Sequence, residues 1–281
     1  MLKSLTMKRK LLYLSFFFAI IGILSILSCQ KDKSSTVVDN TPFNTNSVEK
    51  NAVVTTVAFD ELNDFAQSGF DATSLKGGTF GSCPAVSVNF MTTPFSISLD
   101  WGTGCLYGDG ITRSGTIIMT LSGLMNEKNS VATMKIENFI ADGKKISGTT
   151  KITYMGPNAG NNWPRYSIVS EGKIEFPDKG IVTYRSESVR LQAEGTKTTS
   201  ITDDVWRTEI QSASGVNKDG TKWTGKTTKV MIKKGDCKWY NSGAFVITPE
   251  KGDIKTIDFG DGTCDSKATM KIGDKTTDIT L

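Results

Sequence analysis

The sequence predicts an all-β fold: an antiparallel β-meander that forms a sandwich or an open or closed barrel, with one short N-terminal helix. Two observations carry this prediction. From about residue 84 onward, short runs alternate between residue types typical of a buried face and residue types typical of an exposed face, as half-buried strands do. Turn sequences rich in Gly and Asp separate these runs at hairpin spacing. The alternation is clearest at Ile117/Met119/Leu121, Thr150/Ile152/Tyr154, Trp206/Thr208/Ile210 and Ala268/Met270/Ile272, and the turns at Asp142-Gly143, 177–180, 218–220 and Gly273-Asp274.

The first 28 residues have the order of a secretory signal peptide. A basic start is followed by an apolar run over residues 11–27. The run ends in Ile26-Leu27-Ser28-Cys29, which indicates a lipobox whose cysteine thiol receives a diacylglycerol before cleavage. An uncleaved membrane anchor is the alternative, because the run is about as long as a short span. We expect residues 1–28 to be removed and the mature chain to be held to the membrane through lipidated Cys29.

Residues 29–50 are predicted to form a flexible tether. They are rich in Ser, Thr, Asn and Asp, and such a stretch cannot bury enough apolar surface to offset the entropy cost of ordering. A β-rich domain is then expected over residues 51–281. Near its start, Val57, Leu62 and Phe65 recur at about helical spacing, which favours one short helix over residues 52–70.

Composition argues against several function classes. The net charge of +4 arises from four basic residues in the signal peptide, so 29 of the 33 basic residues remain against 29 acidic ones. A neutral mature chain is a poor partner for nucleic acid. Histidine is absent, which removes the usual general base, a member of the serine triad and the commonest zinc ligand. We therefore expect a non-enzymatic protein that needs no cofactor.

The remaining cysteines predict two disulfides. With Cys29 lipidated, an even number is left, as suits an oxidising compartment, and four cysteines allow three pairings. Paired residues of a hairpin lie symmetrically about its turn. One pair centres on Pro94 and the other on the Glu250-Lys251 step, and both centres fall in turn sequences. The symmetry favours the pairs Cys83–Cys105 and Cys237–Cys264.

The two cysteine pairs belong to two similar units, about residues 83–122 and 237–281, which flank a central meander. The sequence DWGTGC begins at Asp100 in the first unit, and DFGDGTC begins at Asp258 in the second. We interpret them as a degenerate internal repeat. If these turns are structural, both aspartates accept hydrogen bonds from nearby backbone amides. Trp101 and Phe259 then occupy equivalent positions.

Calcium binding is the alternative for the second turn. Asp258, Asp261 and Asp265 offer carboxylate oxygens, although their spacing is not that of an EF-hand loop. Aspartate and glycine are also the residues that tight turns require for purely conformational reasons. We favour the structural interpretation and expect no metal.

Two groups of residues resemble known lipoproteins. Cys29-Gln30-Lys31-Asp32 resembles the start of mature Bacteroidota lipoproteins, in which such residues resemble a surface-export signal, although Lys33 stands where a second acid is expected. Residues 100–105, 113–115, 212–217 and 258–265 resemble an uncharacterised family of these lipoproteins. The resemblance implies an envelope protein anchored in the outer membrane, with exposure at the cell surface as a further expectation. It implies no activity.

Three functions are compatible with the sequence. The leading interpretation is a non-enzymatic envelope lipoprotein with a binding or structural role toward a protein or glycan partner. A carbohydrate-binding component of a surface glycan system is the first alternative. It depends on exposed tryptophans, of which Trp163, in the loop 157–164, is the best candidate, whereas core positions are expected for the others. The second alternative is a hydrolase whose paired carboxylates, such as Glu187 and Glu209, face one groove.

The lipobox generates a prediction about processing. Mass spectrometry of the mature wild-type protein should find an acylated cysteine at position 29 as the first residue. Cys29→Ala should accumulate as the unprocessed precursor, because the thiol that receives the lipid is missing. An intact Met1 or Met7 terminus on the wild-type protein would contradict the assignment.

Overall fold

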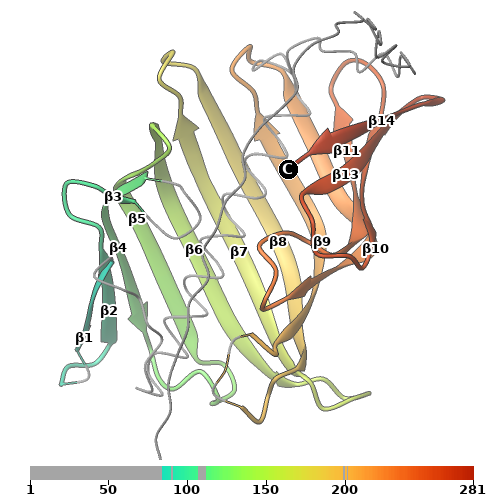
Figure 1. Cartoon of the computed structure of the whole chain (residues 1–281). Helices are drawn as coiled ribbons and strands as arrows, with labels where there is room; N and C mark the ends of the chain where they lie inside the picture. The colour runs from blue at the N-terminus through green and yellow to red at the C-terminus, as the bar shows by residue number, and fades with distance from the viewer. Residues whose placement is uncertain (1–83, 90, 107–111, 199, 201) are drawn as a thin grey trace, which may run out of the picture. The chain divides into compact units, whose positions relative to one another are not determined.

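The computed structural model describes residues 84–89, 91–106, 112–198, 200 and 202–281. These residues are all-β, which confirms the predicted fold class, and their strands form one antiparallel sheet. The strand order follows the chain from β1 to β14, except that β3 lies off this path and pairs with β4 (Figure 1). Within the described residues no helix is long and apolar enough to cross a membrane. The predicted signal peptide, tether and helix over 52–70 lie outside this part of the chain.

The strands have the following bounds: β1 Ala85–Asn89, β2 Phe95–Asp100, β3 Cys105–Leu106, β4 Thr112–Leu121, β5 Val131–Ala141, β6 Lys144–Pro157, β7 Pro164–Glu175, β8 Ile181–Glu194, β9 Val205–Val216, β10 Lys222–Lys234, β11 Ser242–Pro249, β12 Lys255–Asp261, β13 Lys267–Ile272 and β14 Lys275–Thr280.

One face of the sheet is buried and the other is exposed. In β8, buried and exposed residues alternate over most of the strand, and the four alternating runs of the sequence place their residues on the buried side. The buried side chains form two hydrophobic clusters, one mainly on β2 to β7 and one on β8 to β14. Each fully buried large apolar side chain contributes about 1.5–3 kcal/mol, so this face provides the main stabilisation. The opposite face is left for solvent and partners.

The turns fall where the sequence indicated. Asp142 and Gly143 join β5 to β6 with φ of +50° and +71°, as a two-residue hairpin turn of the primed type requires. Between β9 and β10, the Thr221 amide donates to Asp219 Oδ1 at 3.0 Å. The Thr221 hydroxyl also donates to this carboxylate, and these two bonds hold the pKa of Asp219 below its ordinary value. These side-chain bonds replace backbone partners that a turn lacks.

A β-bulge explains the Arg-Ser-Gly sequence in β4. The register with β5 shifts between Ser114 and Thr116, and Gly115 between them has φ of +92°. A Cβ atom at Gly115 would lie 2.5 Å from the backbone oxygen of Asn138, which is itself at positive φ. Only glycine fits this close approach.

A glycine also lets an aromatic ring pack against the backbone on the buried face. Gly148 pairs with Gly172, and farther along the same row Gly215 pairs with both Tyr184 and Trp223. A Cβ atom at Gly215 would lie 2.6 Å from the indole atoms Cε2 and Cζ2 of Trp223 and 2.4 Å from the backbone oxygen of Thr183. The indole therefore lies directly on the backbone of β9.

Gly215→Ala tests this packing. The added methyl group should displace the indole and lower the free energy of unfolding by about 1–3 kcal/mol, as overpacking does. Gly160→Ala is the matched control, because a Cβ atom there meets only the Asn158 side chain, at 3.8 Å. Denaturant unfolding should separate the two variants. Equal stability would show that the sheet accommodates a side chain at Gly215.

Candidate functional site

A groove crosses the exposed face of the sheet over strands β6 to β10. Its volume is about 740 Å³, and each of the five strands contributes three consecutive residues to it: 147–149, 171–173, 183–185, 214–216 and 222–224. The middle residue of each triplet belongs to the buried face, so its backbone forms the floor. The two flanking residues form the walls. We call this feature the transverse groove.

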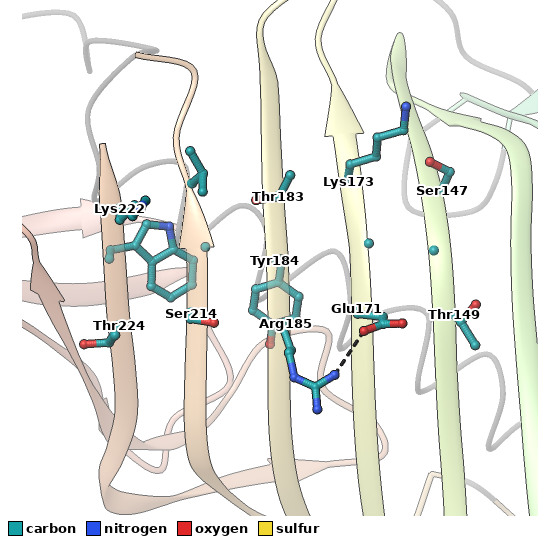
Figure 2. Close-up of a pocket in the computed structure, with 15 residues that line it drawn as sticks. Ser147, Thr149, Glu171, Lys173, Thr183, Tyr184, Arg185, Ser214, Lys222 and Thr224 are labelled. Carbon is teal, nitrogen blue, oxygen red and sulfur yellow. Dashed lines mark hydrogen bonds and ion pairs between the residues drawn. The ribbon is translucent and has the colours of Figure 1, made fainter. Parts of the chain in front are cut away.

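The register of the ladder aligns the wall residues in two rows. The two rows follow opposite sides of the groove, as Figure 2 shows for the residues that it labels. Five strands at about 4.8 Å spacing make the groove about 19 Å long, and the two-residue offset along each strand separates the rows by about 7 Å. One row contains Ser147, Lys173, Thr183, Val216 and Lys222, and the other Thr149, Glu171, Arg185, Ser214 and Thr224.

Three of the four charged side chains on the walls are engaged in ion pairs. Arg185 donates from Nη1 to Glu171 at 3.0 Å, across the β7–β8 ladder (Figure 2), and from Nη2 to Glu187 at 2.9 Å. Lys173 pairs with Glu175 at 2.7 Å, and this bond holds the pKa of Glu175 below its ordinary value. The walls carry three cations, Lys173, Arg185 and Lys222, and one carboxylate, Glu171. Glu175 and Glu187 lie next to the walls and pair with Lys173 and Arg185. The ion pairs fix the direction of the longest wall side chains.

A second depression of about 360 Å³ continues the groove toward β11. It shares Arg185, Ser214 and Thr224 with the transverse groove and extends to Val246 and Thr248. The exposed face therefore carries a continuous channel from β6 to β11.

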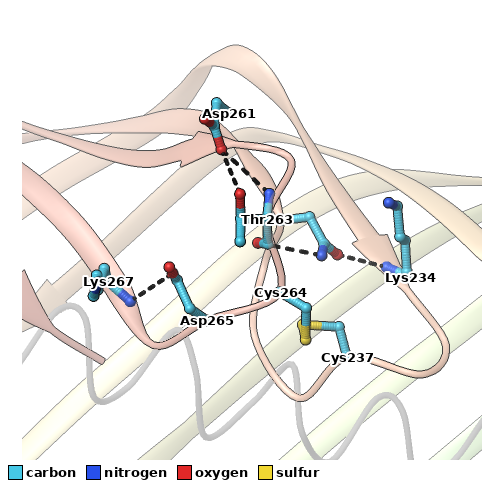
Figure 3. The surroundings of a disulfide bond; sticks show 8 residues. Lys234, Cys237, Asp261, Thr263, Cys264, Asp265 and Lys267 are labelled. Carbon is cyan, nitrogen blue, oxygen red and sulfur yellow. Dashed lines mark hydrogen bonds between the residues drawn. A yellow bond between two sulfur atoms is a disulfide. The ribbon is translucent and has the colours of Figure 1, made fainter.

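One of the two predicted disulfides lies within the described residues. Cys237 and Cys264 are bonded with Cα atoms 5.6 Å apart, which confirms the pairing inferred from hairpin symmetry (Figure 3). This loop of 27 residues should contribute about 3–4 kcal/mol on the chain-entropy model. Cys105 is also disulfide-bonded. Because Cys83 lies outside the described residues, the Cys83–Cys105 pair stays a prediction.

The two Asp-aromatic-Gly turns have the same structure. The Gly102 amide donates to Asp100 Oδ1 at 2.8 Å, and the Gly260 amide donates to Asp258 Oδ1 at 2.9 Å. The aromatic residues between them are both buried. Trp101 packs against Phe139 with ring centroids 4.9 Å apart, and Phe259 against Tyr240 at 5.2 Å. The equivalent hydrogen bonds and aromatic positions expected from the repeat are confirmed.

The aspartates considered for calcium each serve their own turn. Asp261 accepts from the amide and the hydroxyl of Thr263, which lowers the pKa of Asp261, and Asp265 accepts from the Lys267 amide at 3.0 Å (Figure 3). Asp258 is engaged by Gly260. In the described part of the chain, no three His, Cys, Asp or Glu side chains are grouped to hold a metal ion.

The tryptophans do not form an exposed platform. Trp101, Trp206 and Trp223 are buried, as expected for core positions. Trp163 is only half-buried, in the β6–β7 loop, and the Arg207 guanidinium lies 5.9 Å from the centre of its ring. Trp239 is half-buried beside Lys238. An aromatic surface for sugar rings is therefore not what this sheet presents.

The acids considered for hydrolysis do share the exposed face. Glu187 lies on β8 opposite Ser212. Glu209 lies on β9 opposite Val189, which is two residues from Glu187 along β8. Neither carboxylate lines the transverse groove, and Glu187 is paired with Arg185. The paired-carboxylate cleft that a glycosidase needs is not formed by these two residues.

The chain matches no protein-family model, no curated protein and no solved structure. The fold and the site thus define its class by themselves: the described residues form one antiparallel sheet with a groove across its exposed face.

Asp258→Ala tests the structural role of the second turn. Loss of the bond to the Gly260 amide should lower the free energy of unfolding by about 1 kcal/mol. Asp253→Ala, which removes an exposed aspartate in the preceding turn, is the control for the change of charge. Calcium and chelator should leave the melting temperature of the wild type unchanged. A calcium-dependent rise that Asp261→Ala abolishes would contradict the structural interpretation.

Proposed function

We propose that this protein is a lipid-anchored component of the cell envelope and that its β-sheet domain acts by binding rather than by catalysis. The transverse groove carries the proposal. Its volume lies in the range typical of ligand sites, and it is on the face that the core leaves exposed. The lipobox at Cys29 and the polar tether after it support display of this face at a membrane surface.

The groove is pre-organised for binding. Its floor is ladder backbone, paired on both sides in every strand from β6 to β10. Arg185 is held between Glu171 and Glu187, so the largest side chain on the walls is already oriented. A ligand that lies in a rigid groove loses less of its binding free energy to ordering of the protein.

The chemistry of the walls favours some partners over others. Ion pairs with carboxylates engage Lys173 and Arg185, which weakens the attraction that nucleic acid would have for these cations. Serine and threonine hydroxyls favour a polar partner, either a glycan or a hydrophilic protein surface. The hydrolase alternative has less support, since Glu187 and Glu209 lie outside the groove.

Protection from chemical labelling tests the proposal without knowledge of the ligand. In isolated envelopes, Ser214→Cys in the groove should react with a maleimide several-fold more slowly than in the purified full-length protein, because the bound partner covers it. Thr133→Cys, at an outward position of β5 outside the groove, is the control and should react equally in both. Equal labelling of Ser214→Cys in envelopes and in purified protein would overturn the proposal.

A further inference from the structure

We infer that the ligand of the transverse groove is a neutral polyhydroxylated chain, a glycan, that lies across strands β6 to β10. This inference rests on the proposed function and names its ligand class. Three properties of the groove lead to it: the ion pairs of its walls, the hydroxyl groups of its walls and the closed backbone of its floor.

The ion pairs of the walls select against a strongly charged ligand. Two of the three wall cations have a carboxylate close by: Arg185 binds Glu171 and Glu187, and Lys173 binds Glu175. A polyanion would have to displace these carboxylates, and a polycation would have to displace Arg185 and Lys173. A neutral chain leaves every ion pair in place and binds through the hydrogen-bonding groups that the ion pairs do not use.

Hydroxyl groups make up half of the wall residues. Each hydroxyl both donates and accepts hydrogen bonds, as the hydroxyls of a sugar do, so the two surfaces are complementary in any local orientation. The rows are about 7 Å apart, which lets one sugar ring contact both walls. The five hydroxyl side chains are Ser147, Thr149, Thr183, Ser214 and Thr224.

The floor argues against a peptide ligand. Extended peptides bind sheets by adding to a free edge, where backbone N–H and C=O groups have no partner. Strands β6 to β10 lie inside the sheet, each paired on both sides. Recognition in the groove therefore depends on side chains alone.

The dimensions suit a chain rather than a single small molecule. Equivalent wall positions repeat at the strand spacing of about 4.8 Å over about 19 Å, and the second depression extends the path to Val246 and Thr248 on β11. A linear glycan can place successive sugar units over successive strands. Each added unit then meets a further pair of wall residues.

Affinity electrophoresis tests the inference with the full-length protein. Gels containing mannan, dextran or xylan represent neutral glycans, and a gel containing polygalacturonate represents an acidic one. We expect at least one neutral polysaccharide to retard the wild type. The double variant Thr149→Val/Thr224→Val keeps side-chain volume but removes one hydroxyl from each of two strands, and it should weaken the apparent Kd about tenfold, or 1.4 kcal/mol. Thr133→Val is the matched control and should migrate as the wild type does.

Each other outcome overturns the inference in a distinguishable way. Retardation by polygalacturonate alone would show that the ligand class is wrong. Equal retardation of the double variant, with a melting temperature like that of the wild type, would place glycan binding outside the groove. Failure of every polysaccharide while Ser214→Cys stays protected in envelopes would remove the glycan and leave the proposed function standing. Failure of both tests would remove both.

Discussion

Backbone hydrogen bonds between strands that are neighbours in the chain fix which side chains stand in one row, and the rest of the structure depends on this register. A strand has two faces, so a one-residue slip would move every buried side chain of that strand to the exposed face. The same ladder that aligns Ile117 with Ile136 in the core aligns Glu171 with Arg185 in the groove. One pairing pattern therefore determines both the stabilising core on one face of the sheet and the binding surface on the other.

Local sequence patterns predicted much of the fold. Alternation at Ile117, Met119 and Leu121 identifies a half-buried strand. The alternation is caused by burial of every second side chain, and this cause acts over only a few residues of sequence. The turns of Asp100 and Asp258 were predictable for a similar reason, since the carboxylate bonds an amide two residues away. The Cys237–Cys264 pair followed from symmetry about a short turn.

The groove could not be predicted in this way. Its walls combine residues from position 147 to position 224, and each is an ordinary Ser, Thr, Lys, Arg or Glu. What joins them is the register across five strands, which a bulge alters: the β8–β9 pairing shifts between Glu187 and Ser188. The sequence also offered Trp163 as the best candidate for an exposed aromatic surface, but in the structure this ring is half-buried and close to the Arg207 guanidinium.

The meander topology has a consequence for how such proteins can change over evolutionary time. Each strand from β4 to β14 pairs along the sheet with its neighbours in the chain, so no long connection ties distant parts of the sequence together. Duplication or deletion of a whole hairpin within β6 to β10 would leave every other pairing intact and preserve which face is buried. It would lengthen or shorten the groove by two strand spacings, about 10 Å. Related chains could thus differ in the length of ligand they hold while keeping the same core.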